Sequence, residues 1–211
     1  LAHEIRNPVA AIRGAVDELK GSIASPAIAQ RLADIAIRES DHLNRIVTDF
    51  LDFARRPEIR RETFSVLDLV REVAERLRDK CRACEALTIE ASFPAQDCLV
   101  SGDRSQIKQV FMNIAKNGIE AMHEHGVLGI RVVSDSTSVE IRFDDQGAGI
   151  PPDELARIFE PFYTTKPSGV GMGLPVCMRI LTAHDGTIRA TPREGGGTSV
   201  SVRLPILRQE E

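Results

Sequence analysis

The sequence predicts an α plus α/β fold, in which a hairpin of two long helices precedes an α/β sandwich. Two patterns carry this prediction. In residues 1–54 the apolar side chains recur at alternating spacings of four and three, which is the period of a packed helix face. From Phe64 onward, short β-branched runs bounded by turn formers alternate with helical stretches, as expected when helices cover one face of a mainly antiparallel sheet.

Length and charge narrow the class of protein. A chain of 211 residues accommodates one small and one medium domain. Its net charge of -4 lacks the basic surplus of nucleic-acid-binding domains, so we expect no nucleic-acid partner. No apolar run reaches the roughly 18 to 20 residues that cross a bilayer, so no membrane contact by this chain is expected. Four cysteines make no disulfide framework, which favours a cytoplasmic protein with reduced thiols.

The first 56 residues are predicted to form the helical hairpin, with turn formers between Gly21 and Pro26 at the break. The apolar positions are Ile5, Val9, Ile12, Val16, Leu19 and Ile23 in the first helix, and Leu32, Ala36, Leu43, Ile46, Phe50 and Phe53 in the second. Such a hairpin leaves one apolar face uncovered. A second copy would cover it in a dimeric four-helix bundle; packing on the chain's own second domain is the alternative. Because the chain begins without methionine, we expect it to be part of a longer protein.

Residues 57–63 read as an exposed basic linker and residues 64–208 as the second domain. Helices are expected at 67–85, 105–123, 152–159 and 173–184, and strands at 87–93, 128–134, 139–144, 187–191 and 198–204. Cys81 and Cys84 form a Cys-x-x-Cys pair, but a structural zinc site needs a second pair of ligands. We therefore interpret these two cysteines as ordinary helix residues.

His3 is the first candidate for chemistry. The heptad assignment turns it away from the apolar seam, with Glu4 beside it and Asn7 one turn later. An exposed imidazole next to a carboxylate suits a phosphoryl acceptor, because the carboxylate takes the ring proton while the other nitrogen attacks. A lone exposed histidine is usually inert, so the assignment of His3 as an acceptor depends on the residues around it and downstream.

Those residues resemble the sensor histidine kinases of two-component systems. Residues 3–8 (HEIRNP) resemble the family's H-box, and later segments resemble its other motifs in the family's order. These are the N-box at 109–117 (QVFMNIAKN), the first glycine box at 145–150 (DQGAGI), the F-box at 158–163 (IFEPFY), the second glycine box at 169–174 (GVGMGL) and the third at 195–198 (GGGT). The short loop 164–168 and the end of the N-box helix look like the nitrogen-regulation subgroup.

The resemblance implies a gyrase-, chaperone- and histidine-kinase-type ATP-binding domain, with ATP and Mg²⁺. It implies that His3 accepts the phosphoryl group with Glu4 as general base, that Asn7 serves a phosphatase activity, and that the partner is a response-regulator receiver domain. It assigns Asp145 to the adenine amine and Asn117 to the metal. The nucleotide-binding residues that it implies are Asn113, Asn117, Asp145, Gly147, Gly149, Lys166, Gly169, Gly171, Gly173, Leu174 and Thr198.

The residues themselves suit these roles. Asn113 and Asn117 lie one turn apart at the border of an apolar helix face, where amide oxygens can reach a hard cation. The glycines before Leu174 open a helix whose first N–H groups can hold phosphate, and Lys166 lies in the short lid, residues 164–168. Glu120 departs from the basic residue common in the family, and Lys116 or Lys166 is expected to compensate.

Two other classes remain open. Related ATPases carry a glutamate where this chain has Asn113, so rapid hydrolysis is disfavoured here; a conformational ATPase is therefore the weaker reading. The second open class is a non-catalytic dimeric scaffold that binds nucleotide as a switch.

Overall fold

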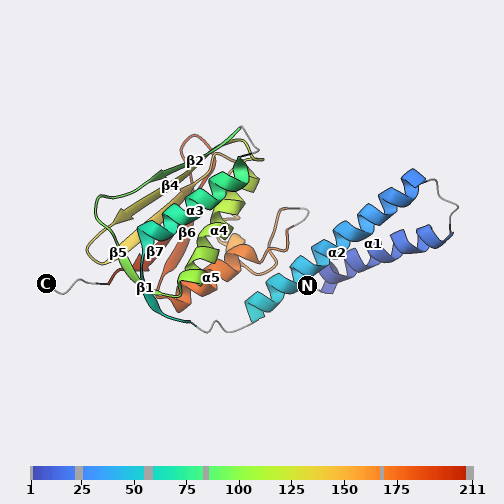
Figure 1. Ribbon diagram of the computed structural model, residues 1–211, viewed down its shortest axis with the longest axis horizontal. Helices are drawn as coiled ribbons and strands as arrows, with labels where there is room; N and C mark the ends of the chain where they lie inside the picture. Colours follow the sequence, from blue (N-terminus) through green and yellow to red (C-terminus); the bar gives the residue numbers. More distant parts are fainter. Residues whose placement is uncertain (1, 22–25, 55–58, 83–85, 167–168, 208–211) are drawn as a thin grey trace. The chain divides into compact units, whose positions relative to one another are not determined.

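The computed structural model describes residues 2–21, 26–54, 59–82, 86–166 and 169–207. Its internal contacts divide the chain into two compact units. The first combines Leu1–Arg56 with Pro161–Met172, and the second combines Pro57–Glu160 with Gly173–Glu211. Figure 1 shows the elements of both, and each unit is described by itself.

The first unit is built on the predicted helical hairpin. Helix α1 is Ala2–Gly21 and helix α2 is Pro26–Ala54, and they pack along their length. Ala15 of α1 and Ile46 of α2 are buried, and so is Pro8, which lies inside α1. Among the hairpin side chains that the structure describes, six large apolar ones are exposed: Val9, Val16, Ile28, Ile37, Val47 and Leu51. The prediction that one hairpin leaves apolar surface uncovered is therefore confirmed.

The second unit contains a five-stranded sheet in the order β2-β4-β5-β7-β6. The strands are β2 Leu87–Ser92, β4 Gly126–Ser134, β5 Ser138–Asp144, β6 Thr187–Pro192 and β7 Thr198–Pro205. The β2–β4 pair is parallel and the other three pairs are antiparallel. The mainly antiparallel sheet expected from the sequence is confirmed.

Three helices cover one face of this sheet, as Figure 1 shows. They are α3 Val66–Cys81, α4 Arg104–Ala121 and α5 Gly173–Ala183. Each sends fully buried side chains toward the sheet, among them Leu69, Phe111 and Leu181, where the inward residues Ile141 and Val202 complete the core. Removal of this apolar surface from water is the main force that holds the layers together.

Two predictions at element level are wrong. Residues 152–159 do not form an α-helix: turns lead into a short 3₁₀ helix, η1, at Arg157–Phe159. Most bonds of the segment span three residues, among them those from the Glu154 N–H to the Pro151 carbonyl and from the Arg157 N–H to the Glu154 carbonyl, both at 2.9 Å; one, from the Ile158 N–H to the Glu154 carbonyl at 3.1 Å, spans four. Prolines 151, 152 and 161 bracket the segment, which leaves too little chain for an α-helical ladder. The helix expected to reach residue 85 ends at Cys81, and Cys84 lies outside the described residues.

A second, two-stranded sheet was not predicted. It pairs β1, Glu62–Ser65, antiparallel with β3, Leu99–Gly102. Four residues are too few to establish an alternating pattern in sequence, and the pairing joins segments far apart in the chain. Strand β1 continues into α3, whose N-cap is Ser65, and β3 leads into α4.

The N-terminus of α4 connects several parts of the second unit. Asp103 is its N-cap: Oδ1 accepts from the N–H groups of Ser105 and Gln106, at 3.0 and 3.1 Å. The Asp103 N–H donates to Nε2 of the buried His184, at 2.9 Å, and His184 Nδ1 lies 2.7 Å from the Ile180 carbonyl. Since Nε2 accepts a bond, the proton of a neutral imidazole lies on Nδ1. His184 thereby joins α5 to the start of α4.

Arg61 also contacts this region. It is exposed, as expected of a solvated basic linker, but its hydrogen bonds were not predicted. Its guanidinium donates to the carbonyls of Ser101 and Ala183 and to Oδ2 of Asp185, at 3.4, 3.2 and 3.2 Å. The Arg60 N–H reaches Asp103 Oδ2 at 3.3 Å. Arg55 and Arg56, the other basic residues of the linker region, lie outside the described residues.

Substituting Asp103→Ala should lower the free energy of unfolding by about 1 to 2 kcal/mol, since an N-cap and a buried acceptor are lost together. Burial raises the pKa of Asp103, but hydrogen bonds from Ser105, Gln106 and Arg60 outweigh it and hold the pKa below 3.8. Its stabilisation is therefore complete above that pH and is lost as the pH falls through the lower, folded-state value. Urea titrations at neutral and acid pH would measure this; a difference from the native chain that stays constant down to pH 2 would contradict it. Asp103→Asn, which keeps the cap oxygen, should cost less.

Candidate functional site

Asp145 is the centre of the site, at the end of β5. It is buried, with 5% of its surface exposed. Its Oδ1 accepts hydrogen bonds from the N–H groups of Gly147 and Thr198, at 2.9 and 3.1 Å, and its own N–H donates to the Thr198 carbonyl at 2.9 Å. Within the described part of the chain every hydrogen bond to this carboxylate ends on Oδ1. Oδ2 accepts none of these bonds.

The groups around Asp145 shift the pKa of its carboxyl group in opposite directions. Burial raises the pKa of its carboxyl group. The two N–H donors and the positive charge of Arg193 lower it, while the neighbouring Asp144 raises it. A buried carboxylate of this kind persists only where hydrogen bonds and a cation support its charge.

Two motif glycines allow the backbone to close around Asp145. A Cβ on Gly197 would lie 2.1 Å from the Asp145 carbonyl oxygen, and its φ of +89° is left-handed. A Cβ on Gly147 would lie 2.6 Å from the Ala121 carbonyl oxygen at the end of α4. No side chain fits at either place. The third glycine box thus acts in the structure by bringing Thr198 against Asp145.

The two asparagines of α4 are half-buried, as their position at the border of the apolar face predicts. The side-chain nitrogen of Asn117 lies 4.0 Å from the place that a Cβ would take on Gly173, the first residue of α5. The amide thus faces a helix N-terminus, whose N–H groups have no partner within the helix. Asn113 hydrogen-bonds the Cys177 thiol of α5, and burial raises the pKa of that thiol to about 12. Sequence reasoning missed Cys177, because nothing local marks it.

Lys166, Gly169 and Gly171 lie in segment 161–172, which contains the predicted lid and belongs by its contacts to the first unit. The N–H of Phe162 donates to the Gly171 carbonyl at 3.1 Å. Both residues are left-handed, with φ of 68° and 69°. A bulky residue rarely adopts this conformation, and it costs on the order of 1 to 3 kcal/mol. The left-handed Phe162 therefore marks a constrained backbone position at the base of the lid.

The same segment shares an apolar cluster with the hairpin. Val170 and Met172 are buried with Ile46 of α2, and Ile5 of α1 and Phe162 pack against them. Packing of the hairpin on part of the chain's own second domain was the alternative left open above. No sequence pattern singles out this segment for it, since apolar residues between glycines carry no period. Ile5 is two residues from His3, so the cluster lies beside the turn of α1 that carries the predicted phosphoryl acceptor.

The predicted catalytic residues occupy the first two turns of α1. Asn7 is exposed, as the heptad assignment requires. The side chains of His3 and Glu4 lie outside the described residues, so their orientation stays a prediction. On α4, Lys116 lies 3.7 Å from Glu120 in an exposed ion pair.

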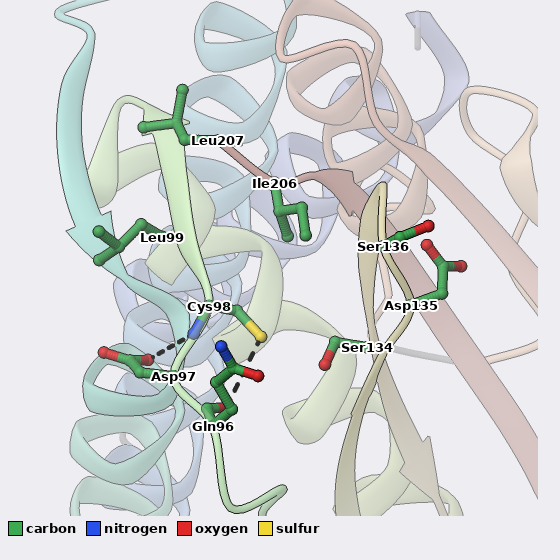
Figure 2. Close-up of a pocket in the computed structure, with 9 residues that line it drawn as sticks. All are labelled: Gln96, Asp97, Cys98, Leu99, Ser134, Asp135, Ser136, Ile206 and Leu207. Carbon is green, nitrogen blue, oxygen red and sulfur yellow. Dashed lines mark hydrogen bonds between the residues drawn. The ribbon is translucent and has the colours of Figure 1, made fainter. Parts of the chain in front are cut away.

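A hollow has a volume of about 380 Å³. Figure 2 draws the residues that line it, none of which belongs to these motifs. Its acidic groups are occupied by the protein itself. Asp97 Oδ1 accepts from Ser65 Oγ and the Cys98 N–H, at 2.8 and 2.7 Å. Asp135 accepts from the guanidinium of Arg203 and from the N–H of Ser138 in the turn that follows it. None of the predicted site residues lines this hollow, which is therefore a surface feature separate from the site.

No group of three His, Cys, Asp or Glu side chains in the described ranges is placed to hold a metal ion. Nor does any helix in those ranges have the length and apolar character needed to cross a membrane.

The buried carboxylate, the amides of α4 and the glycine turns define a nucleotide-binding domain of known class. The model of the "Histidine kinase-, DNA gyrase B-, and HSP90-like ATPase" family matches residues 102–208, and that of the "His Kinase A (phospho-acceptor) domain" matches residues 1–59. The two occur together in the order that the hairpin and the sandwich have here. The chain belongs to the sensor histidine kinases of two-component systems.

Similar proteins agree with this assignment. Sporulation kinase C of Bacillus subtilis (strain 168) is 34% identical over 98% of this chain and 47% of its own length. Histidine kinase ThkA, solved in complex with response regulator protein TrrA, is 30% identical, with a TM-score of 0.81 over 98% of this chain and 60% of that one. Full-length ShkA, solved with AMPPNP, is 25% identical, with a TM-score of 0.71 over 100% of this chain and 46% of that one. The chain spans about half the length of the curated relatives it matches.

Gly197→Ala should abolish measurable ATP binding, because the added Cβ would push Thr198 and its N–H away from Asp145. The matched control is Gly195→Ala, which has the same φ of +89° but no atom within 4 Å of the added carbon. It shares the conformational cost, roughly 1 to 2 kcal/mol, without the collision. Calorimetric ATP titration of both variants, with circular dichroism to verify folding, is the measurement. Equal affinities for the two variants would show that the close approach is not needed.

Proposed function

We propose that the chain is the kinase core of a two-component sensor, which transfers the γ-phosphoryl group of ATP to His3 and then to an aspartate of a response-regulator receiver domain. The observation that carries this proposal is the buried Asp145 carboxylate, with Oδ1 held by two backbone N–H groups and Oδ2 left for a ligand. It occurs in a chain whose first helix carries the H-box.

The adenine specificity follows from Asp145. A carboxylate oxygen accepts a hydrogen bond from the exocyclic amine of adenine, whereas guanine presents a carbonyl at that place, which would repel it. Thr198 fixes the carboxylate from the other side. The binding of AMPPNP, an ATP analogue, by the structurally similar ShkA supports the choice of nucleotide.

For the phosphates we propose the N-terminus of α5 with Gly173 and Leu174, together with Gly149, Gly169, Gly171 and Lys166 of the glycine turns and lid. A helix N-terminus with free N–H groups attracts anions. Lys166 adds a positive charge for the terminal phosphate.

Mg²⁺ fits the donor set beside this terminus. Amide oxygens are suitable ligands for a hard cation that takes its other ligands from phosphate and water. Asn117, whose amide faces Gly173, would hold the ion, and Asn113 stands one turn before it. When bound, Mg²⁺ would neutralise phosphate charge.

The proposed transfer is an in-line displacement at the γ-phosphorus. His3 Nε2 forms the new P–N bond, the bond from phosphorus to the bridging oxygen of ADP breaks, and ADP leaves. Glu4 takes the proton from Nδ1, so the ring returns to neutrality. A carboxylate of the receiver domain can then attack this phosphorus. The P–O bond of an acyl phosphate forms, the P–N bond breaks, and the leaving imidazole regains its proton from Glu4.

We further propose that the cytoplasmic chain acts as a homodimer through its hairpin. The exposed apolar residues of α1 and α2, among them Val9, Val16, Ile37 and Leu51, support this. Each such side chain would gain on the order of 1.5 to 3 kcal/mol on complete burial. A second copy offers the same apolar surface and completes a four-helix bundle.

Glu4 and the exposed Asn7 also fit a phosphatase activity toward the regulator. A side-chain amide on the acceptor helix can orient a water molecule against an acyl phosphate. The competing functions are a nucleotide-binding scaffold and a conformational ATPase. The amide of Asn113 favours neither rapid hydrolysis nor a water-activating role, because it has no useful basicity.

Incubation with Mg²⁺ and γ-labelled ATP should give an acid-labile, alkali-stable label on the native chain and none on His3→Gln. The control is His42→Gln, a half-buried histidine of α2 that pairs with Glu39 and should leave labelling unchanged. ATP binding without label would favour the scaffold. Steady phosphate release that His3→Gln does not alter would favour the ATPase.

Asn7→Ala should remove most phosphatase activity toward a phosphorylated receiver domain while leaving much of the autokinase rate, since Asn7 has no part in the attack on ATP. Asn44→Ala, an exposed asparagine on α2, is the matched control. Dephosphorylation of the receiver and labelling of the kinase would be followed in parallel. Equal loss of both activities would overturn the assignment.

A further inference from the structure

Arg193 contacts Asp145 from the β6–β7 turn, two residues before the third glycine box, and is not itself part of that motif. It follows β6, in the turn that leads to β7, and is half-buried. Its guanidinium Nη1 donates to the backbone carbonyl of Asp145 at 2.5 Å. Its own N–H donates to the Gly197 carbonyl, and its carbonyl accepts from the Gly196 N–H, both at 3.2 Å.

These bonds connect Arg193 with the residues that shape the site. The Asp145 carbonyl that it caps is the same atom that Gly197 approaches too closely for a side chain. Thr198, the next residue, donates to the Asp145 carboxylate. Arg193 thus closes the glycine turn on one side of Asp145 while Thr198 holds the other.

The charged groups around Asp145 give Arg193 a second effect. Arg193 is the cation that acts favourably on the carboxylate, and Asp144 acts against it. Helix α4 and strand β4 present uncharged neighbours here, Gly118 and Leu128. A positive charge near a buried carboxylate favours its ionised form, and removal of that charge favours the neutral acid.

We propose that Arg193 is a positioning residue for adenine recognition: its guanidinium closes the glycine turn on the Asp145 backbone and supplies the positive charge that keeps the carboxylate an acceptor. The inference rests on the proposed ATP-binding function and deepens it.

The hydrogen-bond pattern gives this role a specific consequence. Oδ1 already accepts from two N–H donors, so a proton on Asp145 has to reside on Oδ2, the oxygen that would face the base. The protonated group would turn a donor toward the adenine amine, which is also a donor. The same proton could be donated to the carbonyl of hypoxanthine, so protonation should reverse part of the preference for ATP over inosine triphosphate.

The test compares the native chain with Arg193→Gln and Arg193→Lys across pH 5 to 8, by titration with ATP and with inosine triphosphate in the presence of Mg²⁺. Arg193→Gln retains a donor for the Asp145 carbonyl but removes the charge, and Arg193→Lys retains the charge. The matched control is Arg189→Gln, an exposed arginine of β6. Below the pKa of Asp145, ATP affinity should fall by about tenfold for each pH unit.

In Arg193→Gln this fall, and the loss of preference for ATP over inosine triphosphate, should begin at higher pH than in the native chain. Arg193→Lys should restore the native profile, and Arg189→Gln should not depart from it. A loss of affinity in Arg193→Gln that is the same at every pH and for both nucleotides would mean a structural role alone and would overturn the inference. Failure of the native chain to bind ATP at any pH would instead overturn the proposed function, and this inference with it.

Discussion

The two-way hydrogen bonding between Asp145 and Thr198 is the constraint on which the nucleotide site depends. The register of β5 against β7 ends at Asp144 and Ser199, and the Asp145–Thr198 bonds continue that pairing by one step beyond the strand. Sheet formation therefore delivers the carboxylate to a fixed place, and no flexible loop has to find it. The glycine turn is needed for the same reason, because any Cβ at residue 197 would separate the two residues.

The sequence was sufficient for those features that local pattern determines. Heptad spacing predicted α1 and α2, and the apolar arc of α4 predicted the half-buried position of Asn113 and Asn117. The sequence was insufficient for features that depend on contacts between residues far apart in the chain. The four-residue strands β1 and β3 exist only because each supplies the other's hydrogen bonds. Nothing in the local sequence marks the contacts of Arg193 and Arg61, since their acceptors are carbonyls 48 and 122 residues away in the chain.

Segment 161–172 shows a different limit of sequence reasoning. Its glycines read as nucleotide motifs, yet its apolar side chains are buried against the hairpin. Displacing the segment from α2 would expose Val170 and Met172, which costs on the order of 1.5 to 3 kcal/mol for each side chain. The left-handed Phe162 at its base is strained, and strain of this kind persists only where the surroundings hold it. Packing and strain therefore oppose each other in the segment that carries Lys166.

The position of Asn113 links the fold to the choice between phosphoryl transfer and hydrolysis. Its amide hydrogen-bonds a thiol whose raised pKa keeps it protonated at neutral pH. An amide held between α4 and α5 in this way can fix the two helices relative to each other, but it cannot take a proton from water. Without a base at this position, we expect attack by water on a bound γ-phosphate to be slow. The phosphoryl group would then remain available to a better nucleophile, and the imidazole of His3, which we propose as the acceptor, meets that requirement.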